Sequence, residues 1–465
     1  MRTSVKVLSV LIRNTKGEDF MSHQQNLKWK ERLSYSGGTL GSNFLSACIN
    51  TYLLVYYTNF IHISPGIVGS IMLVSKILDA VSDIVIGLLI EKMGKPGSKA
   101  RPWIRCMYFP FIMISISLFC VPSFSAPTGQ ILYIFVTYNA FCTIYTALNI
   151  PYRALNGLIT ENRKERELLS LLCNIFTTVS SMIVNSFTLT FVQKAGNTRY
   201  SWTLVVSIYA VISGLSYYIC YKNTTERIIT PAVSPQRASV SSRLWILRHD
   251  LSCVFRNKHW CLLAVNSFFS SMTISLNGGS MYYFLTDVCH SPRSIPVVGM
   301  ILSVPMLFLV PLSKLLVNRW GLRNGLAAGY VLLILGRIIT GTGSAFGTIP
   351  IYLGSFLFAV GCSTQWCITP LLLHSIDYGE KTFGIRQDGM LLSASSFLGK
   401  CGTALGTATC GWILALTNYH RNAMFQPPTV LHGIQVLYVY LPILFSALSF
   451  VILLFYNMDS YRKAN

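Results

Sequence analysis

Two aspartates one helical turn apart lie inside an apolar stretch of the sequence. Asp79 and Asp83 are spaced i, i+4, and Lys76 precedes Asp79 by three residues, so a helix places all three on one face. Inside a membrane each such charge costs at least about 2.5–3.5 kcal/mol, which makes it a candidate functional residue. With the Ser82 hydroxyl, the carboxylates offer hard oxygen ligands that suit a small cation such as Na⁺. Two alternatives stay open: the pair shares a proton, or it only balances the charges of Lys76 and Lys400.

Two further side chains of unusual type lie in the middle of apolar stretches. Lys400 has three glycines within six positions, and small residues allow neighbouring helices to approach closely. A buried lysine needs an anionic partner, and the sequence predicts that this partner is Asp79 or Asp83. Trp366 has polar neighbours. A Trp in this setting can grip the face of a sugar, and it is equally good packing material.

Other polar side chains in apolar stretches have weaker implications. Arg337, next to Gly336, points either into the interior or along its helix toward the membrane surface. Five amides lie in apolar stretches of the N-terminal half, where they either contact a ligand or only hold helices together. They are Asn43, Asn50, Asn139, Asn149 and Asn174.

Mixed charges lie where apolar stretches meet short polar loops. Asp377, Glu380 and Arg386 follow one such stretch, and Arg166 stands in an Arg-Lys-Glu-Arg-Glu segment after another. Opposite charges at these places can form inner-gate salt bridges that break and re-form as a membrane protein opens and closes. Charges that are simply solvated in loops are an equally weighted alternative.

The composition requires that these residues be carried by membrane helices. The chain has 465 residues, of which 52% are hydrophobic and 11% are charged, and its mean hydropathy is +0.51. Soluble domains are about a quarter charged, so a large soluble catalytic domain is excluded. Twelve apolar stretches are long enough to cross the hydrocarbon core as helices. They are 34–60, 66–90, 103–125, 130–152, 168–192, 201–221, 259–285, 295–317, 324–345, 349–374, 387–416 and 434–456.

The basic residues indicate how the chain is oriented. Thirty of the 37 Lys and Arg residues lie in the two tails and the even-numbered loops, and only four lie in the odd-numbered loops. The positive-inside rule then predicts a multi-pass protein of the plasma membrane with both termini in the cytoplasm. This distribution accounts for the net charge of +21 without a nucleic-acid partner. The 13 cysteines include no C-x-x-C pair, so no disulfide framework or zinc site is expected.

The longest internal loop divides the predicted spans into six plus six. We therefore expect an all-α polytopic membrane protein with the major-facilitator fold, in which twelve transmembrane helices form two six-helix halves. The predicted parts are a cytoplasmic tail (1–30), an N-terminal half (31–221), a cytoplasmic linker (222–258), a C-terminal half (259–456) and a cytoplasmic tail (457–465). Residues 1–20 either belong to the first tail or form an extension ahead of a start at Met21.

Several segments stand out by their order and spacing. They are Asp79-Ala-Val-Ser-Asp83, Lys99-Ala-Arg101-Pro102-Trp103, Asn149-Ile-Pro151-Tyr152 and Asp377-Tyr-Gly-Glu380. Across about 31–456 the chain resembles the glycoside–pentoside–hexuronide:cation symporter family, the melibiose-permease branch of the major-facilitator superfamily. In that family the acidic pair of the second span binds Na⁺, Li⁺ or H⁺. The resemblance implies a cation site at Asp79, Ser82, Asp83 and Thr146, with Lys400 and Trp366 at the sugar.

The sequence departs from melibiose-type members at positions expected to contact the sugar. Asn43 and Asn149 stand where those members have carboxylates, and Asn174 stands where they have an arginine. The usual Gly-Asp of the first span is Gly38-Thr39. Amides still bond to hydroxyls, but charge-assisted hydrogen bonds are stronger, so another glycoside, a pentose derivative or a non-sugar solute replaces melibiose as the expected cargo. The expected substrate contacts are Asn43, Asn149, Arg153, Asn174, Trp366 and Lys400.

Together these observations predict a secondary transporter. Its expected activity is symport of a sugar or glycoside into the cell, driven by a cation (Na⁺, Li⁺ or H⁺) and achieved by alternating access between the halves. No enzyme motif is present, and no cofactor is expected. The expected partners are the sugar, the coupling cation and the lipid bilayer, but not nucleic acid. Two alternatives stay open: transport of a non-sugar solute such as a lipid or drug, and a transporter-like sensor without flux.

Overall fold

The computed structural model describes residues 27–93, 100–123, 126–160, 162–228, 257–383, 388–420, 423 and 425–456. The predictions for residues 1–26, including the start site, for most of the linker (229–256), for Arg386 and for the tail at 457–465 lie outside the described residues. All regular secondary structure in the described part is helical.

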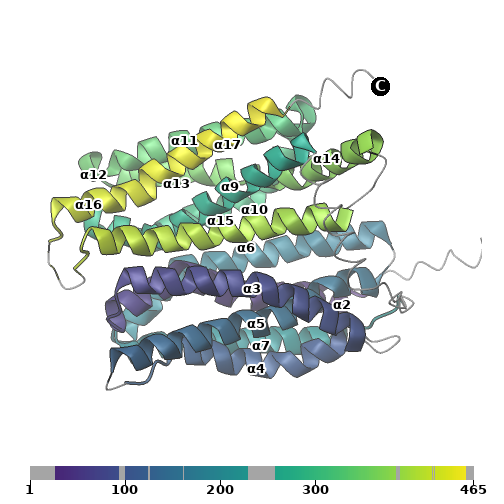
Figure 1. Cartoon of the computed structure of the whole chain (residues 1–465), viewed down its shortest axis with the longest axis horizontal. Helices are drawn as coiled ribbons and strands as arrows, with labels where there is room; N and C mark the ends of the chain where they lie inside the picture. The colour runs from purple at the N-terminus through teal and green to yellow at the C-terminus, as the bar shows by residue number, and fades with distance from the viewer. Residues whose placement is uncertain are drawn as a thin grey trace, which may run out of the picture.

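The first half contains six long helices (Figure 1). They are α2 (Trp29–Val55), which continues as the π-helical turn η1 (Tyr56–Phe60), α3 (Pro65–Met93), α4 (Arg101–Phe119), α5 (Pro127–Ile159), α6 (Arg163–Lys194) and α7 (Arg199–Asn223). Local sequence explains several of their starts. Proline opens α3 and α5, where its missing N–H costs nothing. The hydroxyls of Thr198 and Ser201 form a capping box at α7.

The second half repeats this plan with more interruptions. It consists of α9 (Lys258–Tyr283) with η2 (Phe284–Val288), α10 (Ser294–Trp320), α11 (Leu322–Gly341) with the short α12 (Gly343–Phe346), α13 (Thr348–Cys362), the 3₁₀ turn η3 (Gln365–Cys367), α14 (Ile368–Phe383), α15 (Asp388–Leu416), α16 (Pro428–Gln435), η4 (Val436–Tyr440) and α17 (Leu441–Phe455). The tenth predicted span is therefore two helices, α13 and α14, separated by a break.

The predicted twelve-span architecture is confirmed, since each predicted span coincides with one long helix or one interrupted helix. Seven of the described helical segments are long and apolar enough to cross a membrane by length and composition alone. They are α4, α5, α6, α7, α11, the α13–α14 pair and the α16–α17 pair. By contrast, α2 and α9 are rich in Ser, Gly and Asn, and they pack against each other and against other helices of their own halves.

A short sequence repeat relates the two halves. The turn after η1 reads Thr-Asn-Phe-Ile-His-Ile-Ser-Pro (58–65), and the turn after η2 reads Thr-Asp-Val-Cys-His-Ser-Pro (286–292). His62 and His290 both have the left-handed backbone conformation, with φ of 71° and 49°. Equivalent turns at the ends of α2 and α9 are expected if the halves are two copies of one six-helix unit.

The halves meet mainly along two seams, α3 against α15 and α6 against α10, and α2 also contacts α9. A Cβ built on Gly69 would lie 2.9 Å from the carbonyl oxygen of Ala408, and one built on Gly411 would lie 3.0 Å from Cα of Gly69. On the second seam, a Cβ on Gly299 would lie 2.8 Å from the carbonyl oxygen of Asn185. Only glycine permits such close packing. All three glycines lie toward the end of the bundle where α2 ends, here called the far end; the opposite end, where α2 begins, is the tail end.

Candidate functional site

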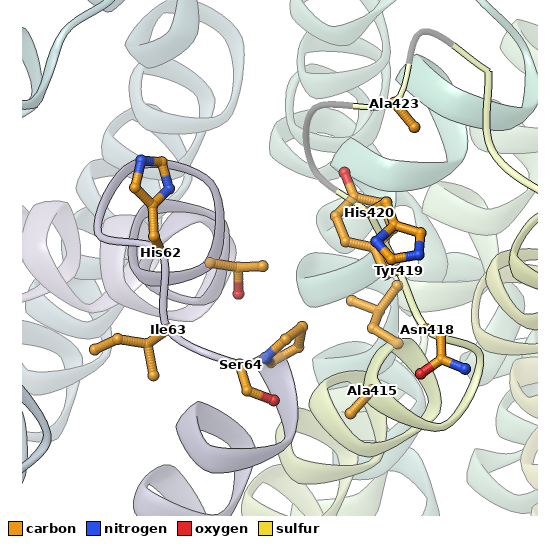
Figure 2. Close-up of a pocket in the computed structure, with 11 residues that line it drawn as sticks. His62, Ile63, Ser64, Ala415, Asn418, Tyr419, His420 and Ala423 are labelled. Carbon is orange, nitrogen blue, oxygen red and sulfur yellow. The ribbon is translucent and has the colours of Figure 1, made fainter. Parts of the chain in front are cut away.

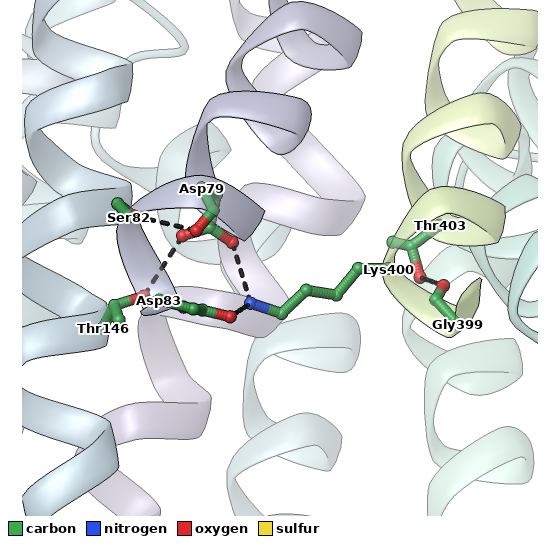
Figure 3. Close-up of polar contacts among 7 residues, drawn as sticks. All are labelled: Asp79, Ser82, Asp83, Thr146, Gly399, Lys400 and Thr403. Carbon is green, nitrogen blue, oxygen red and sulfur yellow. Dashed lines mark hydrogen bonds and ion pairs between the residues drawn. The ribbon is translucent and has the colours of Figure 1, made fainter. Parts of the chain in front are cut away.

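The acidic pair lies on α3, one turn apart, and faces α5. The Thr146 hydroxyl on α5 is 3.1 Å from Oδ1 of Asp79 and 2.9 Å from Oδ1 of Asp83 (Figure 3). Because a hydroxyl has one proton, Thr146 donates to one carboxylate at a time and leaves its lone pairs available to a cation. Asp79, Asp83 and Thr146, three of the four residues that the resemblance implies for a cation site, are thus within reach of one another.

Lys400 reaches this pair from α15 of the other half. Its Nζ lies 3.2 Å from Oδ2 of Asp79 and also pairs with Oδ2 of Asp83 (Figure 3). The predicted pairing of Lys400 with the span-2 aspartates is confirmed. The ammonium therefore stands among the oxygens that would coordinate a small cation, and it joins the two halves by an ion pair.

The Ser82 hydroxyl bonds to its own helix, and its role as a cation ligand stays a prediction. Its hydroxyl donates a 2.8 Å hydrogen bond to the main-chain oxygen of Asp79, one turn earlier on the same helix. Its proton is therefore committed to the backbone, and only its oxygen lone pairs could contact an ion.

The charges around the acidic pair balance without a bound ion. Asp79 is 6% exposed, whereas the side chain of Asp83 is 30% exposed. Lys76 and Lys400 both line a cavity of about 110 Å³ next to Asp79. Two carboxylates and two ammonium groups sum to zero, which lowers the cost of burying this cluster in a membrane. A cation that enters must displace Lys400 from the carboxylates or leave the cluster with a net positive charge.

Asn43 is used mainly to join helices. Its Nδ2 donates to the main-chain oxygen of Thr177 at 2.8 Å and lies 2.9 and 2.7 Å from the hydroxyls of Ser180 and Ser181, all on α6. The amide protons are thus spent on the contact between α2 and α6. Only the carbonyl oxygen of Asn43 remains for a substrate. Its role as a sugar contact stays a prediction, limited to accepting a hydrogen bond from a sugar hydroxyl.

The other predicted sugar contacts in the first half are unengaged. The side chains of Asn149, Arg153 and Asn174 form no hydrogen bond or ion pair with another described residue. Asn149 is buried, while Arg153 and Asn174 are exposed. Asn149 lies about one turn from Thr146, next to the group of Lys76, Asp79, Asp83 and Lys400, here called the cation cluster. Its neutral amide and a guanidinium one turn further on, without a partner among the described residues, suit a solute with several oxygen acceptors.

Trp366 lies at the break between α13 and α14. The backbone leaves the α-helix at Ser363, and the 3₁₀ turn that follows contains Trp366. Its ring is partly buried and packs against the hydrophobic core of the second half. Broken helices at membrane depth are typical of substrate sites in transporters, so packing and substrate binding both remain compatible with this position.

The predicted inner-gate charges lie in different halves of the protein. Arg166 donates to the main-chain oxygens of Thr160 at 2.7 Å and Gly157 at 2.9 Å, which end α5. It thus caps a helix of its own half. Asp377 and Glu380 lie at the tail end of α14, and Arg386 lies outside the described residues.

Ion pairs that the sequence analysis missed fasten the tail end of the first half. Arg32 pairs with Glu165 at 2.6 Å, and Glu31 pairs with Arg227 at 2.8 Å. Each pair joins residues more than 130 positions apart. Charges at both ends of apolar stretches were the visible signal, but their partners depend on how the helices are arranged.

A larger cavity of about 490 Å³ lies at the far end of the α3–α15 seam. His62 and Ser64 of the first half line one side, and Asn418, Tyr419 and His420 of the second half line the other (Figure 2). This cavity is separate from the cation cluster, which lies further along α3.

Asp287 lies just beyond the predicted span 259–285, in η2. Burial raises the pKa of its carboxyl to about 6, although hydrogen bonds with Tyr419 and Thr286 and the nearby His290 act in the opposite direction. The equivalent residue in the repeat of the first half is the neutral Asn59.

Comparison with known sequences identifies the family. Residues 34–460 match the family described as MFS/sugar transport protein. The chain is 30% identical over 446 residues to the isoprimeverose transporter of Lactiplantibacillus pentosus, across 94% of this chain and 90% of that protein. It is 28% identical over 444 residues to the putative glycoside/cation symporter YagG of Escherichia coli (strain K12), across 94% of this chain and 93% of that protein.

Solved structures share the fold at low sequence identity. A D-xylose–proton symporter has a TM-score of 0.65 at 12% identity, covering 90% of this chain and 97% of that one. The nucleoside transporter NupG has a TM-score of 0.58 at 16% identity, covering 93% of this chain and 99% of that one. With a family match over most of its length and this fold, the chain belongs to the MFS/sugar transport family of multi-pass membrane transporters, within the glycoside–pentoside–hexuronide:cation symporter group.

Proposed function

We propose that this protein is a cation-coupled symporter that carries a sugar or glycoside into the cell through the plasma membrane. The observation that carries the proposal is the ion pair across the halves, in which Lys400 of α15 neutralises Asp79 and Asp83 of α3. A transporter needs a way to sense its coupling ion at the interface that moves. An acidic pair held by a removable ammonium from the opposite half provides one.

Cation binding changes this interface directly. Na⁺ or Li⁺ would take oxygens from both carboxylates and from Thr146, and H⁺ would bind to one carboxylate. Either event releases Lys400, and the freed ammonium can then donate to sugar oxygens. We therefore propose that Lys400 links cation binding to substrate binding, so that the fully loaded carrier reorients more readily than the partly loaded one.

The sugar would bind between the halves, beside the cation cluster. The proposed contacts are the amides of Asn149 and Asn174, the guanidinium of Arg153, the ring of Trp366 and the carbonyl oxygen of Asn43. The names of two relatives, an isoprimeverose transporter and a putative glycoside/cation symporter, support this cargo class. The absence of carboxylates at positions 43 and 149 favours a cargo other than a galactoside.

The described state favours access from the tail end. The glycine contacts between the halves lie toward the far end, and Asp83, on the tail side of Asp79, is the more exposed of the two carboxylates. The positive-inside rule assigns the tail end to the cytoplasm. On this assignment the structure is inward-facing, with the linker and both tails in the cytoplasm.

The test is uptake into right-side-out membrane vesicles with an imposed Na⁺ or H⁺ gradient. The labelled panel consists of isoprimeverose, melibiose, a phenyl glucuronide and 2,3-dihydroxypropane-1-sulfonate. We expect gradient-driven accumulation of at least one glycoside, and its loss in Asp83→Cys. Asp287→Asn is the matched control, because it removes a carboxylate at the far end and leaves the cluster intact.

Each other outcome contradicts part of the proposal. Accumulation that persists in Asp83→Cys would place the cation site elsewhere. Binding of a glycoside without accumulation under any gradient would favour a transporter-like sensor. Failure of the whole panel to bind would direct the search to non-sugar cargo, such as a lipid or a drug.

A further inference from the structure

One buried cation has no part in the proposed cation site. Arg337, about one turn before the end of α11, is 1% exposed. Its guanidinium lies between two rings, 3.9 Å from the centre of Phe358 on α13 and 4.2 Å from that of Tyr438 in η4. It forms no ion pair within the described part of the chain, and its Nε and Nη1 have no hydrogen-bond partner there. Retaining a charge that costs several kcal/mol to bury indicates a function.

Among the described residues, the single polar contact of Arg337 is with Asn277 on α9. Nη2 of Arg337 donates to Oδ1 of Asn277. Because a guanidinium has only donors, the amide must present its oxygen to Arg337 and turn its NH₂ group away. An asparagine that would otherwise be free to flip is thereby fixed as a hydrogen-bond donor toward whatever lies on its other side. The two rings hold the guanidinium plane and prevent it from following the amide.

Asn277 is not fully enclosed, and the next residue of α9 faces the other half. The residue is partly exposed, whereas Arg337, Phe358 and Tyr438 are at most 2% exposed. Its NH₂ group has no acceptor among the described residues. The next residue, Gly278, faces α2 of the other half, since a Cβ built on it would lie 3.7 Å from the main-chain oxygen of Asn50. The amide is thus on a turn of α9 that packs against the other half, where the proposed function places the sugar.

We propose that Arg337 is a positioning residue that holds Asn277 with its NH₂ group toward the translocation path, where it donates a hydrogen bond to an oxygen of the sugar. The proposal rests on the proposed transport function and adds a substrate contact in the second half. It also explains why a side chain with donors and no acceptor is kept among aromatic rings: an apolar side chain could occupy the space but could not fix the direction of the amide.

The experiment is a double-mutant cycle on transport kinetics, using labelled isoprimeverose or, if another panel member is the better substrate, that glycoside. Asn277→Ala should raise KM about five- to tenfold, the value of one hydrogen bond, with kcat within twofold of wild type. Arg337→Leu should raise KM by a similar factor. The double variant should raise KM no further than Asn277→Ala, because Arg337 acts through the amide.

Asn277→Asp separates an effect on substrate binding from an effect on folding. It supplies Arg337 with a carboxylate, so the purified protein should unfold at the same or a higher temperature than wild type. At the same time it replaces a donor by a charged acceptor, so KM should change at least fivefold. A structural role alone predicts the change in unfolding temperature without the change in KM.

Asn266→Ala is the matched control on the same helix. Asn266 is fully engaged, with Nδ2 donating to the main-chain oxygen of Ser449 at 3.0 Å and Oδ1 accepting from Tyr330 at 2.6 Å. Its loss should lower the unfolding temperature and leave KM unchanged. The inference is wrong if Asn277→Asp folds and transports with a wild-type KM, or if the KM effects of Asn277→Ala and Arg337→Leu multiply in the double variant. The proposed function is what fails if the wild-type protein accumulates no panel member.

Discussion

Replacing Lys400 by methionine removes the ammonium from the cation cluster and keeps a side chain of similar length. Nζ lies 3.2 Å from Oδ2 of Asp79, and at an effective dielectric constant of about 20 this pair attracts by about 5 kcal/mol. The side chains of Lys400 and Asp83 are 33% and 30% exposed, so solvent screening and lost hydration reduce the net value. A hydrogen bond between charged groups retains about 1.5–3 kcal/mol, which corresponds to roughly ten- to hundredfold in affinity.

A cation that must displace Lys400 therefore binds at least about tenfold more weakly than it would to the bare carboxylates. We expect Lys400→Met to lower the half-saturating concentration of the coupling cation by that factor, measured by titrating the purified protein. Gradient-driven accumulation should be lost, because the ion-free carrier would then have to reorient with uncompensated carboxylates. Exchange of labelled for unlabelled sugar across vesicles should persist, since the loaded carrier does not need this return step.

Thr403→Val is the matched control for Lys400→Met. The Thr403 hydroxyl lies one turn further along α15 and donates only to the main-chain oxygen of Gly399, at 3.1 Å (Figure 3). Its replacement should leave both cation affinity and accumulation within twofold of wild type. A half-saturating concentration that stays constant or rises in Lys400→Met would refute the idea that Lys400 competes with the cation.

Three further variants test separate parts of the structure. Thr146→Val removes the hydroxyl shared by the carboxylates and should raise the half-saturating Na⁺ concentration about three- to tenfold in the same titration; an unchanged value would exclude Thr146 as a ligand. Asp287 has a raised pKa, so the folded protein loses stability as the pH rises from about 4 to about 6. At pH 7.5 Asp287→Asn should therefore be more stable than wild type by up to about 3 kcal/mol in free energy of unfolding and should unfold at a higher temperature, with no difference near pH 4. Equal unfolding temperatures of the two proteins at both pH values would contradict the raised pKa. Gly411→Val places a side chain against the main-chain oxygen of Pro65 on the seam and should abolish uptake without loss of protein from the membrane, whereas normal uptake would show that the seam need not close this tightly.

Much of the fold could be predicted because apolar stretches and charged loops alternate so regularly. The predicted span 259–285 corresponds to α9 and η2, and the span 387–416 corresponds to α15, within a few residues. The ion pairs of Lys400 with Asp79 and Asp83 were equally predictable, since the two aspartates share a helical face and Lys400 had few other anions to pair with. In both cases the spacing of residues along the chain is enough to predict where they lie in the structure.

What the sequence did not predict depends on contacts between distant helices. Nothing local distinguishes Asn43, which joins α2 to α6, from Asn149, whose side chain has no hydrogen-bond partner in the described part of the chain. The break at Ser363 leaves a stretch whose hydropathy reads as one continuous span. Arg337 could not be assigned to the interior or to the surface, because its setting is made by rings on α13 and η4. The repeat that relates residues 58–65 to residues 286–292 was visible in the sequence and could have been found there.

The charge balance of the cluster determines how membrane voltage acts on transport. Without a bound ion, the formal charges of Asp79, Asp83, Lys76 and Lys400 sum to zero, so on the proposed mechanism the empty carrier moves no net charge when it returns. With one bound cation the same cluster carries a single positive charge inward. A potential of 100 mV, inside negative, then favours the loaded step by about 2.3 kcal/mol and leaves the return step unaffected. The protein would therefore generate an inward current with each sugar, and voltage would change the rate of one half of its cycle only.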